Sequence, residues 1–153
     1  MGQIKLIALD MDGTLLDPED NVSQANREAI SQAQQKGVHV VLSTGRFIGS
    51  TSEYAEMLGL TSYLVTSNGG EIWDETGKLV ERHLWPNEQV GWMRDLAQKK
   101  GARYWGTSTD RVWHWGEFPD DPSAYDWLKF GFNTENDQVR EEIWTSLLAT
   151  NEL

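Results

Sequence analysis

Two carboxylates separated by one residue follow a short apolar segment near the N-terminus. Asp10 and Asp12 lie in the stretch ALDMDGTLLD, and Gly13 comes directly after the second acid. Acids this close repel each other, so a cation beside them or a reaction that uses both would account for the pair. One carboxylate can serve as a nucleophile and the other as a proton shuttle, with Mg²⁺ as the hard cation that prefers oxygen ligands. Gly13 permits a tight turn whose amides can face an anion.

A second polar group follows the next predicted strand. The segment Ser43-Thr44-Gly45-Arg46 comes directly after the β-branched run at 38–42. A hydroxyl group and the amides that open a helix suit a phosphoryl oxygen. Ligands of open α/β sheets lie beyond the carboxyl ends of the strands. We therefore expect Asp10, Asp12 and Thr44 to border one crevice.

The first 70 residues alternate between strand and helix patterns, which favours an α/β fold with a parallel sheet and right-handed crossovers. The strand at 4–9 is nearly all apolar, so we expect it to be buried on both faces. The predicted strands are 4–9, 38–42 and 63–66, and the predicted helices are 23–36 and 47–58.

After Gly70 the pattern changes, and we place a domain boundary there, between residues 1–70 and 71–153. The alternation before and after the turn at 74–77 predicts a hairpin. The remaining predicted elements are a helix at 86–100, strands at 103–106 and 111–115, and a helix at 133–151.

The eight tryptophans all lie at position 73 or later. Our main interpretation is that they are large core residues of a small module, since aromatic side chains bury much area. The alternative is an aromatic wall for a substrate such as a sugar. Trp113 and Trp115, which would share a strand face, are the best candidates for such a wall.

The charge and composition exclude several classes of function. The chain has 24 acidic residues against 13 Lys and Arg, a net charge of −11, which disfavours nucleic-acid and anionic membrane partners. The absence of cysteine excludes disulfides and thiolate catalysis and fits a reducing compartment. No apolar run approaches the ~20 residues of a membrane span, and the start does not read as a signal peptide. We expect a cytoplasmic protein that binds a small phosphorylated metabolite.

The stretch Asp10-Met11-Asp12-Gly13-Thr14 resembles the Asp-x-Asp-Gly-Thr signature of the haloacid dehalogenase superfamily. Together with residues 42–46 and 67–70, it is similar to the Cof-type sugar-phosphatase branch, whose α/β cap follows the third strand. The match is close over residues 4–70 and rests on pattern alone over 71–153. The resemblance implies a partial Rossmann-like core at 1–70 and part of an α+β cap at 71–153.

The resemblance also implies roles for individual residues. Asp10 would attack phosphorus and form an aspartyl-phosphate, and Asp12 would protonate the leaving alcohol and then activate water. The carboxylate of Asp10 and the backbone carbonyl of Asp12 would hold Mg²⁺. The implied phosphate-binding residues are Met11, Thr44 and Gly45, and the other residues near the site are Gly13, Thr14, Arg46 and Asn68, the last near the hinge to the cap.

Two elements of the family pattern are not found in this sequence. The family supplies a phosphoryl-neutralising lysine and a second acidic strand end after the cap. The segment 112–121, with Glu117 and Asp121 after an apolar strand and Lys99 or Lys100 before it, imitates both and leaves open a compact, capless protein. Our preferred interpretation is a fragment or subunit completed by another polypeptide or a swapped copy. The strand at 4–9 would then be a bare edge, which invites pairing.

Several plainer interpretations stay open. Asp10 and Asp12 could form a turn and a helix cap, Thr44 an ordinary N-cap, and Asn68-Gly69 a simple turn. The histidines lack metal-ligand spacing. The functional alternatives to a phosphatase are an incomplete, catalytically weak module that binds phosphate and a mutase that transfers a phosphoryl group between sugars.

Overall fold

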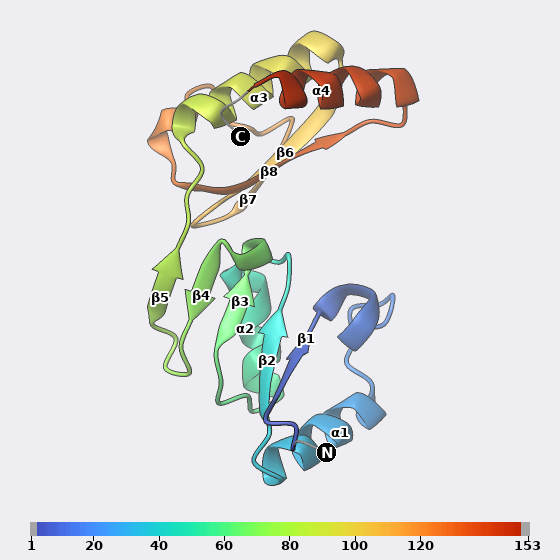
Figure 1. The fold of residues 1–153 in the computed structure, drawn as a ribbon, viewed down its shortest axis with the longest axis vertical. Coiled ribbons are helices and arrows are strands. Elements are labelled where there is room, and N and C mark those ends of the chain that lie inside the picture. Colours follow the sequence, from blue (N-terminus) through green and yellow to red (C-terminus); the bar gives the residue numbers. More distant parts are fainter. Residues whose placement is uncertain (1–2, 151–153) are drawn as a thin grey trace. The chain divides into compact units, whose positions relative to one another are not determined.

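The structure is a computed structural model that describes residues 3–150 (Figure 1). The chain divides into two compact units, one ending at His83 and the other beginning at Leu84. The division therefore falls after the predicted hairpin, and not at Gly70 where the sequence pattern changes. The reason is that the hairpin hydrogen-bonds to the third strand and extends the first sheet.

The first unit contains a five-stranded sheet in the order β1-β2-β3-β4-β5. Strands β1, β2 and β3 are parallel, whereas β4 and β5 add an antiparallel hairpin. Helices α1 and α2 connect the parallel strands, which confirms the predicted α/β class. The bounds are β1 Leu6–Leu9, α1 Gln24–Gln35, β2 His39–Ser43, α2 Ile48–Met57, β3 Leu64–Thr66, β4 Glu71–Trp73 and β5 Leu79–Arg82.

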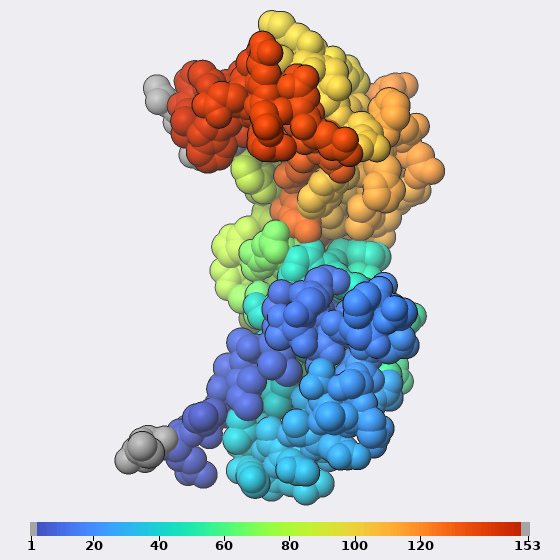
Figure 2. All heavy atoms as spheres, turned by 90° about the vertical axis from the view of Figure 1, so that its right-hand side faces the viewer, coloured from blue at the N-terminus to red at the C-terminus, as the bar shows by residue number. Residues whose placement is uncertain are grey.

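Strand β1 lies at the edge of this sheet, and the expected burial on both faces is wrong. Its residues alternate between exposed and half-buried, and Leu6 is 56% exposed. The dark-blue segment that includes β1 lies uncovered on the face shown in Figure 2. The physical reason is that successive side chains point to opposite faces, and only the face with Ile7 and Leu9 packs against α1 and the core, which leaves the face with Leu6 and Ala8 uncovered. The strand is also at the sheet edge, with β2 as its one strand neighbour among residues 3–150.

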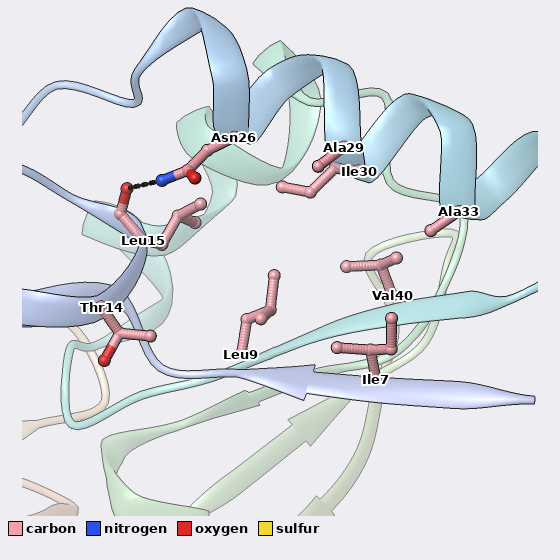
Figure 3. A pocket seen from close by; sticks show the side chains of 9 residues that line it. All are labelled: Ile7, Leu9, Thr14, Leu15, Asn26, Ala29, Ile30, Ala33 and Val40. Atoms are coloured by element: carbon pink, nitrogen blue, oxygen red, sulfur yellow. Dashed lines mark hydrogen bonds between the residues drawn. The ribbon is translucent and has the colours of Figure 1, made fainter. Parts of the chain in front are cut away.

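An apolar pocket of about 180 Å³ lies between this edge of the sheet and α1 (Figure 3). The side-chain amide of Asn26 donates to the backbone carbonyl of Leu15 at 3.1 Å at one end of it. Neither acid of the Asp10–Asp12 pair lines this pocket. Its lining residues are Ile7, Leu9, Thr14, Leu15, Asn26, Ala29, Ile30, Ala33 and Val40.

The second unit packs two helices against one face of a three-stranded antiparallel sheet in the order β7-β6-β8 (Figure 1). The first of these helices ends as predicted, with Gly101 at φ 66° after it. The predicted start of the last helix at residue 133 is wrong, because Asn133 ends β8 and Asn136 caps a helix that begins at Asp137. Strand β8 is not anticipated by the sequence. The predicted end of the last helix, Asn151, lies outside the described residues. The bounds are α3 Asn87–Lys100, β6 Arg103–Ser108, β7 Val112–His114, β8 Trp127–Asn133 and α4 Asp137–Ala149.

Burial of the tryptophans supports the core interpretation over the substrate wall. Trp127 and Trp113 are buried, and the Trp113 indole N–H donates to the hydroxyl of Ser108 at 2.8 Å. Trp115 lies beyond the end of β7 and is exposed. Trp113 and Trp115 therefore do not form one accessible strand face, because the first belongs to the core and the second follows the strand.

Within residues 3–150, no helix has the length and apolar character needed to cross a membrane.

Candidate functional site

The carboxyl ends of the three parallel strands carry the predicted site residues. Asp10 follows β1 directly, and the register pairs Leu9 with Leu42 on β2. The backbone N–H of Thr44 donates to the carbonyl of Val65 on β3 at 2.9 Å. The polar residues after β1, β2 and β3 therefore lie at one edge of the sheet, as ligand-binding residues of parallel sheets do.

Asp10 begins a short helical turn at Met11–Leu15. Its carboxylate accepts a hydrogen bond from the Met11 backbone N–H at 2.8 Å, so part of the cap interpretation is present in the structure. Gly13 adopts φ 69°, which confirms the predicted tight turn. The Met11 side chain is fully buried in the core. Only the main chain of Met11 can therefore contact a ligand at this edge.

Asp12 is held by Arg46, which reaches it from the loop after β2. The Arg46 Nη2 lies 2.6 Å from Asp12 Oδ1, and Nε lies 3.1 Å from Oδ2. These hydrogen bonds lower the pKa of the Asp12 carboxyl, and the same contacts raise the pKa of Arg46. Asp12 stays 58% exposed, so the paired carboxylate remains accessible to a ligand. The loops after β1 and β2 are thus joined by a charge-assisted pair.

Thr44 is 3% exposed, and its Oγ1 accepts a hydrogen bond from the Arg46 backbone N–H at 3.1 Å. The N-cap interpretation of Thr44 is nevertheless wrong, because α2 begins at Ile48 and its N-cap is Phe47. Accepting the bond from Arg46 leaves the hydroxyl hydrogen of Thr44 able to donate, since a hydroxyl both donates and accepts. Thr44 can therefore organise its loop and still contact a phosphoryl oxygen.

The turn after β3 is tied to the loop after β2. The backbone N–H of Asn68 donates to the Thr44 carbonyl at 3.0 Å, and that of Ser67 to the Arg46 carbonyl at 2.8 Å. Ser67 and Asn68 both adopt left-handed backbone conformations, with φ 53° and 59°. Asn68 therefore lies beside the site as expected, and it is a main-chain hydrogen bond that holds it there.

Three residues at this edge were not singled out by the sequence. The hydroxyls of Thr66 and Ser67 are buried without a hydrogen-bond partner. Asp20, in the turn after the first helical turn, accepts a hydrogen bond from Arg46 Nη2 at 2.5 Å. The residues 18–21 around Asp20 are typical of a turn. No local pattern there predicts a contact with a residue far along the chain. Only the folded chain brings Asp20 to Arg46.

The donor set at the Asp pair fits a magnesium ion that completes its shell with other oxygens. Since the Asp12 carboxylate is bonded to Arg46, its backbone carbonyl and the Asp10 carboxylate are the groups left to hold a cation. Mg²⁺ often takes one or two carboxylates and fills its shell with water and substrate phosphate. No group of three or more acidic or histidine side chains within residues 3–150 could hold a metal by itself.

The segment 112–121 does not supply the phosphoryl-neutralising lysine or the second acidic strand end of the family pattern. Strand β7 belongs to the separate three-stranded sheet, so Glu117 does not follow a strand of the parallel sheet. Glu117 pairs with Arg111, and Lys100 pairs with Glu142 at 2.7 Å. Asp121 caps the turn at 122–124. The capless alternative is wrong, because these groups stabilise local structure in the second unit.

The structure has an α/β fold with two acids at the end of its first strand, and comparison with known proteins gives the family. A sequence model of the haloacid dehalogenase-like hydrolases matches residues 7–149. The chain belongs to this family, and the predicted superfamily is confirmed. Phosphatase YcsE of Bacillus subtilis (strain 168), a 5-amino-6-(5-phospho-D-ribitylamino)uracil phosphatase, is 47% identical over 150 residues. The match covers 98% of this chain and 60% of YcsE, so the chain spans about 60% of that relative's length.

Other relatives agree with this assignment. Phosphatase YwpJ of the same strain is 43% identical over 76 residues, which cover 50% of this chain and 27% of YwpJ. A haloacid dehalogenase-like hydrolase from B. subtilis superposes with a TM-score of 0.80 at 20% identity, covering 96% of this chain and 67% of its own. The subclass IIB sugar phosphatase BT4131 gives 0.76 at 19% identity, covering 94% and 64%. These structures share the fold.

Proposed function

We propose that this chain carries the nucleophile and the acid–base residue of a phosphatase that hydrolyses small phosphate esters with Mg²⁺. The observation that carries the proposal is the Asp12–Arg46 pair at 2.6 Å, which joins the loop after Asp10 to the loop of Thr44. A carboxylate free to attack, a second carboxylate held in place and a hydroxyl on the neighbouring strand end meet the needs of phosphoryl transfer.

The reaction proceeds in two steps. The Asp10 carboxylate attacks phosphorus and the bond from phosphorus to the ester oxygen breaks. Asp12, which must first take up a proton from solvent against the charge of Arg46, passes that proton to the departing alcohol. Asp12, now ionised, takes a proton from water, and the water oxygen attacks the aspartyl-phosphate. Inorganic phosphate and the Asp10 carboxylate are released, and Asp12 is protonated again. Thr44 and the amides of its loop bind the equatorial oxygens during both steps.

Magnesium supplies the positive charge that offsets the phosphate and carboxylate anions when it is bound. The carboxylate of Asp10 and the backbone carbonyl of Asp12 would hold it. Family membership supports this choice, as does the all-oxygen donor set described above.

The substrate class that we propose is a phosphate monoester of a sugar or sugar alcohol. Two observations support it. The relative YcsE is named for a substrate with a phosphorylated ribityl chain, and BT4131 is a sugar phosphatase with the same fold. The cytoplasmic location and the completion of the sheet by a further polypeptide rest on sequence reasoning and stay predictions.

Phosphate release from ribitol 5-phosphate, measured with the whole chain and Mg²⁺, tests the proposal. Asp10→Asn should abolish release, and EDTA should do the same and be reversed by added Mg²⁺. Asp137→Asn is the matched control, because Asp137 is an exposed acid of α4 that pairs with Arg140. Equal activity in Asp10→Asn and the unmodified chain would show that the nucleophile lies elsewhere.

A second candidate is a module that binds phosphate and turns over weakly or not at all. One observation favours it: Arg46, the cation bonded to Asp12, is already shared with Asp20. The charge of a transferred phosphoryl group is usually stabilised by several cations together. Phosphate would then raise the melting temperature of the chain while no ester is hydrolysed, and Thr44→Val would remove that stabilisation.

A further inference from the structure

Three buried polar atoms of the first unit make fewer hydrogen bonds than they could. The hydroxyl oxygens of Thr66 and Ser67 have no partner within residues 3–150, and these residues are 0% and 2% exposed. Glu71 is 0% exposed, and its Oε2 accepts from the Trp73 indole N–H at 3.3 Å, a long bond. Buried polar atoms of folded proteins nearly always have partners, so these three require an explanation.

The strand register brings two of the three atoms to the same place. Strands β3 and β4 are antiparallel and pair Thr66 directly with Glu71, so the two side chains point to one face of the sheet. Opposed residues of such strands have Cβ atoms about 4.5–5.5 Å apart. The next pair on that face is Leu64 and Trp73, which both pack in the core of the first unit. Thr66 and Glu71 are therefore neighbours on the covered face of the sheet.

The charge of Glu71 makes an incompletely bonded oxygen costly. Arg82 on β5 donates Nε to Glu71 Oε1 at 2.8 Å, and its Nη2 lies 2.6 Å from the same oxygen. Both contacts of the guanidinium go to Oε1, so Oε2 keeps the long bond from Trp73. A buried ion pair is stable only when its remaining lone pairs are hydrogen-bonded as well. Glu71 Oε2 therefore needs a further donor.

Water is the molecule that suits these three atoms. Neither hydroxyl bonds Glu71 Oε2 directly, although each could donate. One water can accept from a hydroxyl and donate to two further oxygens, and internal waters usually bridge about three buried groups of this kind. A cation suits the atoms less well because Arg82 already balances the charge of Glu71. An anion would be repelled by the carboxylate.

We propose that Thr66, Ser67 and Glu71 bind one internal water molecule at the end of β3. The Thr66 hydroxyl donates to the water oxygen, and the water donates to Glu71 Oε2 and to Ser67 Oγ. The site belongs to the first unit alone and does not depend on the proposed phosphatase activity.

The water stabilises a turn that borders the candidate site. Ser67 and Asn68 adopt left-handed φ values of 53° and 59°, which are costly for residues with a side chain. Their backbone N–H groups donate to the carbonyls of Arg46 and Thr44 at 2.8 and 3.0 Å. A hydrogen bond to Ser67 Oγ offsets part of this cost. The water thereby keeps the turn against the loop that follows β2.

The direction of one stability change tests the proposal. Thr66→Val keeps the shape of the side chain and removes its hydroxyl. If that hydroxyl binds water, the urea midpoint of the first unit should fall by about 0.5–1.5 M, because a hydrogen bond is lost. An unbonded hydroxyl gives the opposite sign, since the variant no longer buries an unpaired polar group. A midpoint that rises or stays the same overturns the proposal.

The native indole N–H resonance of Trp73, followed in urea by NMR on the whole chain, measures this midpoint. Trp73 is the one tryptophan before residue 84, and its N–H bonds Glu71. Thr51→Val is the matched control. Thr51 is 0% exposed and donates Oγ1 to the Phe47 carbonyl at 3.0 Å, so this variant shows the effect of losing a hydroxyl that is bonded within the chain.

Two further measurements locate the water. Ser67→Ala should also lower the midpoint, by about 0.5–1 M, and it keeps the left-handed strain because alanine has a Cβ as well. A crystal structure of the whole chain should show density for one water about 2.7–3.0 Å from both Thr66 Oγ1 and Glu71 Oε2. A direct bond between those two oxygens, or no density beside them, would overturn the proposal whichever way the midpoints move.

Discussion

The glycines of the second unit allow one substitution to be compared at two places with opposite expected effects. A Cβ atom built on Gly106 in β6 would lie 2.8 Å from Cζ3 of Trp127 and 2.9 Å from Cε2 of Phe118. These two rings stack with centroids 4.8 Å apart and planes 11° apart. Because each ring blocks the retreat of the other, Gly106→Ala forces strain into the core. A Cβ on Gly91 in α3 would meet no atom within 4 Å.

The magnitudes follow from these contacts. Overpacking a tight core costs about 1–3 kcal/mol, and replacing glycine by alanine in a strand returns about 0.5–1 kcal/mol. Gly106→Ala should therefore lower the free energy of unfolding by about 0.5–2 kcal/mol, the difference between the lower ends and between the upper ends of those ranges. Gly91→Ala should raise it by about 0.5–1 kcal/mol, since alanine favours a helix interior over glycine.

Urea unfolding followed by tryptophan fluorescence measures both effects in the whole chain. Every tryptophan except Trp73 lies in residues 84–153, so this signal reports mainly the second unit. With a slope of about 1 kcal/mol per molar urea for so small a unit, the midpoint should fall by about 0.5–2 M in Gly106→Ala and rise by about 0.5–1 M in Gly91→Ala. A Gly106→Ala midpoint at or above that of the unmodified chain would refute the reasoning, because the rings would then have moved aside freely.

Three further predictions concern the ion pairs and caps. Arg82→Met should lower the free energy of unfolding of the first unit by about 3–5 kcal/mol in urea titrations followed by circular dichroism, since it leaves the fully buried Glu71 unpaired; a smaller loss in the double variant with Glu71→Gln would identify the unpaired charge as the cause. Asn136→Ala removes the cap that accepts from two backbone N–H groups of α4 and should cost about 1 kcal/mol in urea unfolding followed by fluorescence, and an unchanged midpoint would contradict this role. Because Arg46 holds the pKa of Asp12 below its ordinary 3.8, the stabilisation is present above that pH and lost as pH falls further; acid unfolding should be shallower in Asp12→Asn, and an identical profile would show that the pair adds no pH-dependent stability.

The periodicity of apolar residues and the turn residues were enough to predict most of the helices and strands. The spacing of apolar residues predicted four helices close to their observed places, because this signal depends on residues within a few positions of each other. Strand β8 was not predicted because Gly131 interrupts its apolar run, and a glycine inside such a run argues against a strand. The folded chain explains that glycine: a Cβ there would lie 2.5 Å from the Trp105 ring.

The positions of the candidate site residues in the fold were predictable in part, and the limit is again one of distance along the chain. The acids after β1 and the polar residues after β2 and β3 were predictable, since parallel strands bring their carboxyl ends to one edge. The partners of those residues were not. Arg46 was placed near the site without a role, and Asp20 was placed only in a turn, because no local pattern encodes a contact between residues 26 positions apart.

The sequence by itself determined the class of fold and the chemistry on offer: a parallel α/β unit whose strand ends carry two aspartates, a glycine turn and a threonine. Those features depend on residue type and short-range spacing, which are read directly from the chain. Tertiary structure alone decided that β1 is an edge strand and that the β4–β5 hairpin belongs to the first sheet. It also decided that Arg46 forms ion pairs with both Asp12 and Asp20. The physical reason is that strand order, burial and ion pairing are fixed by packing between distant segments.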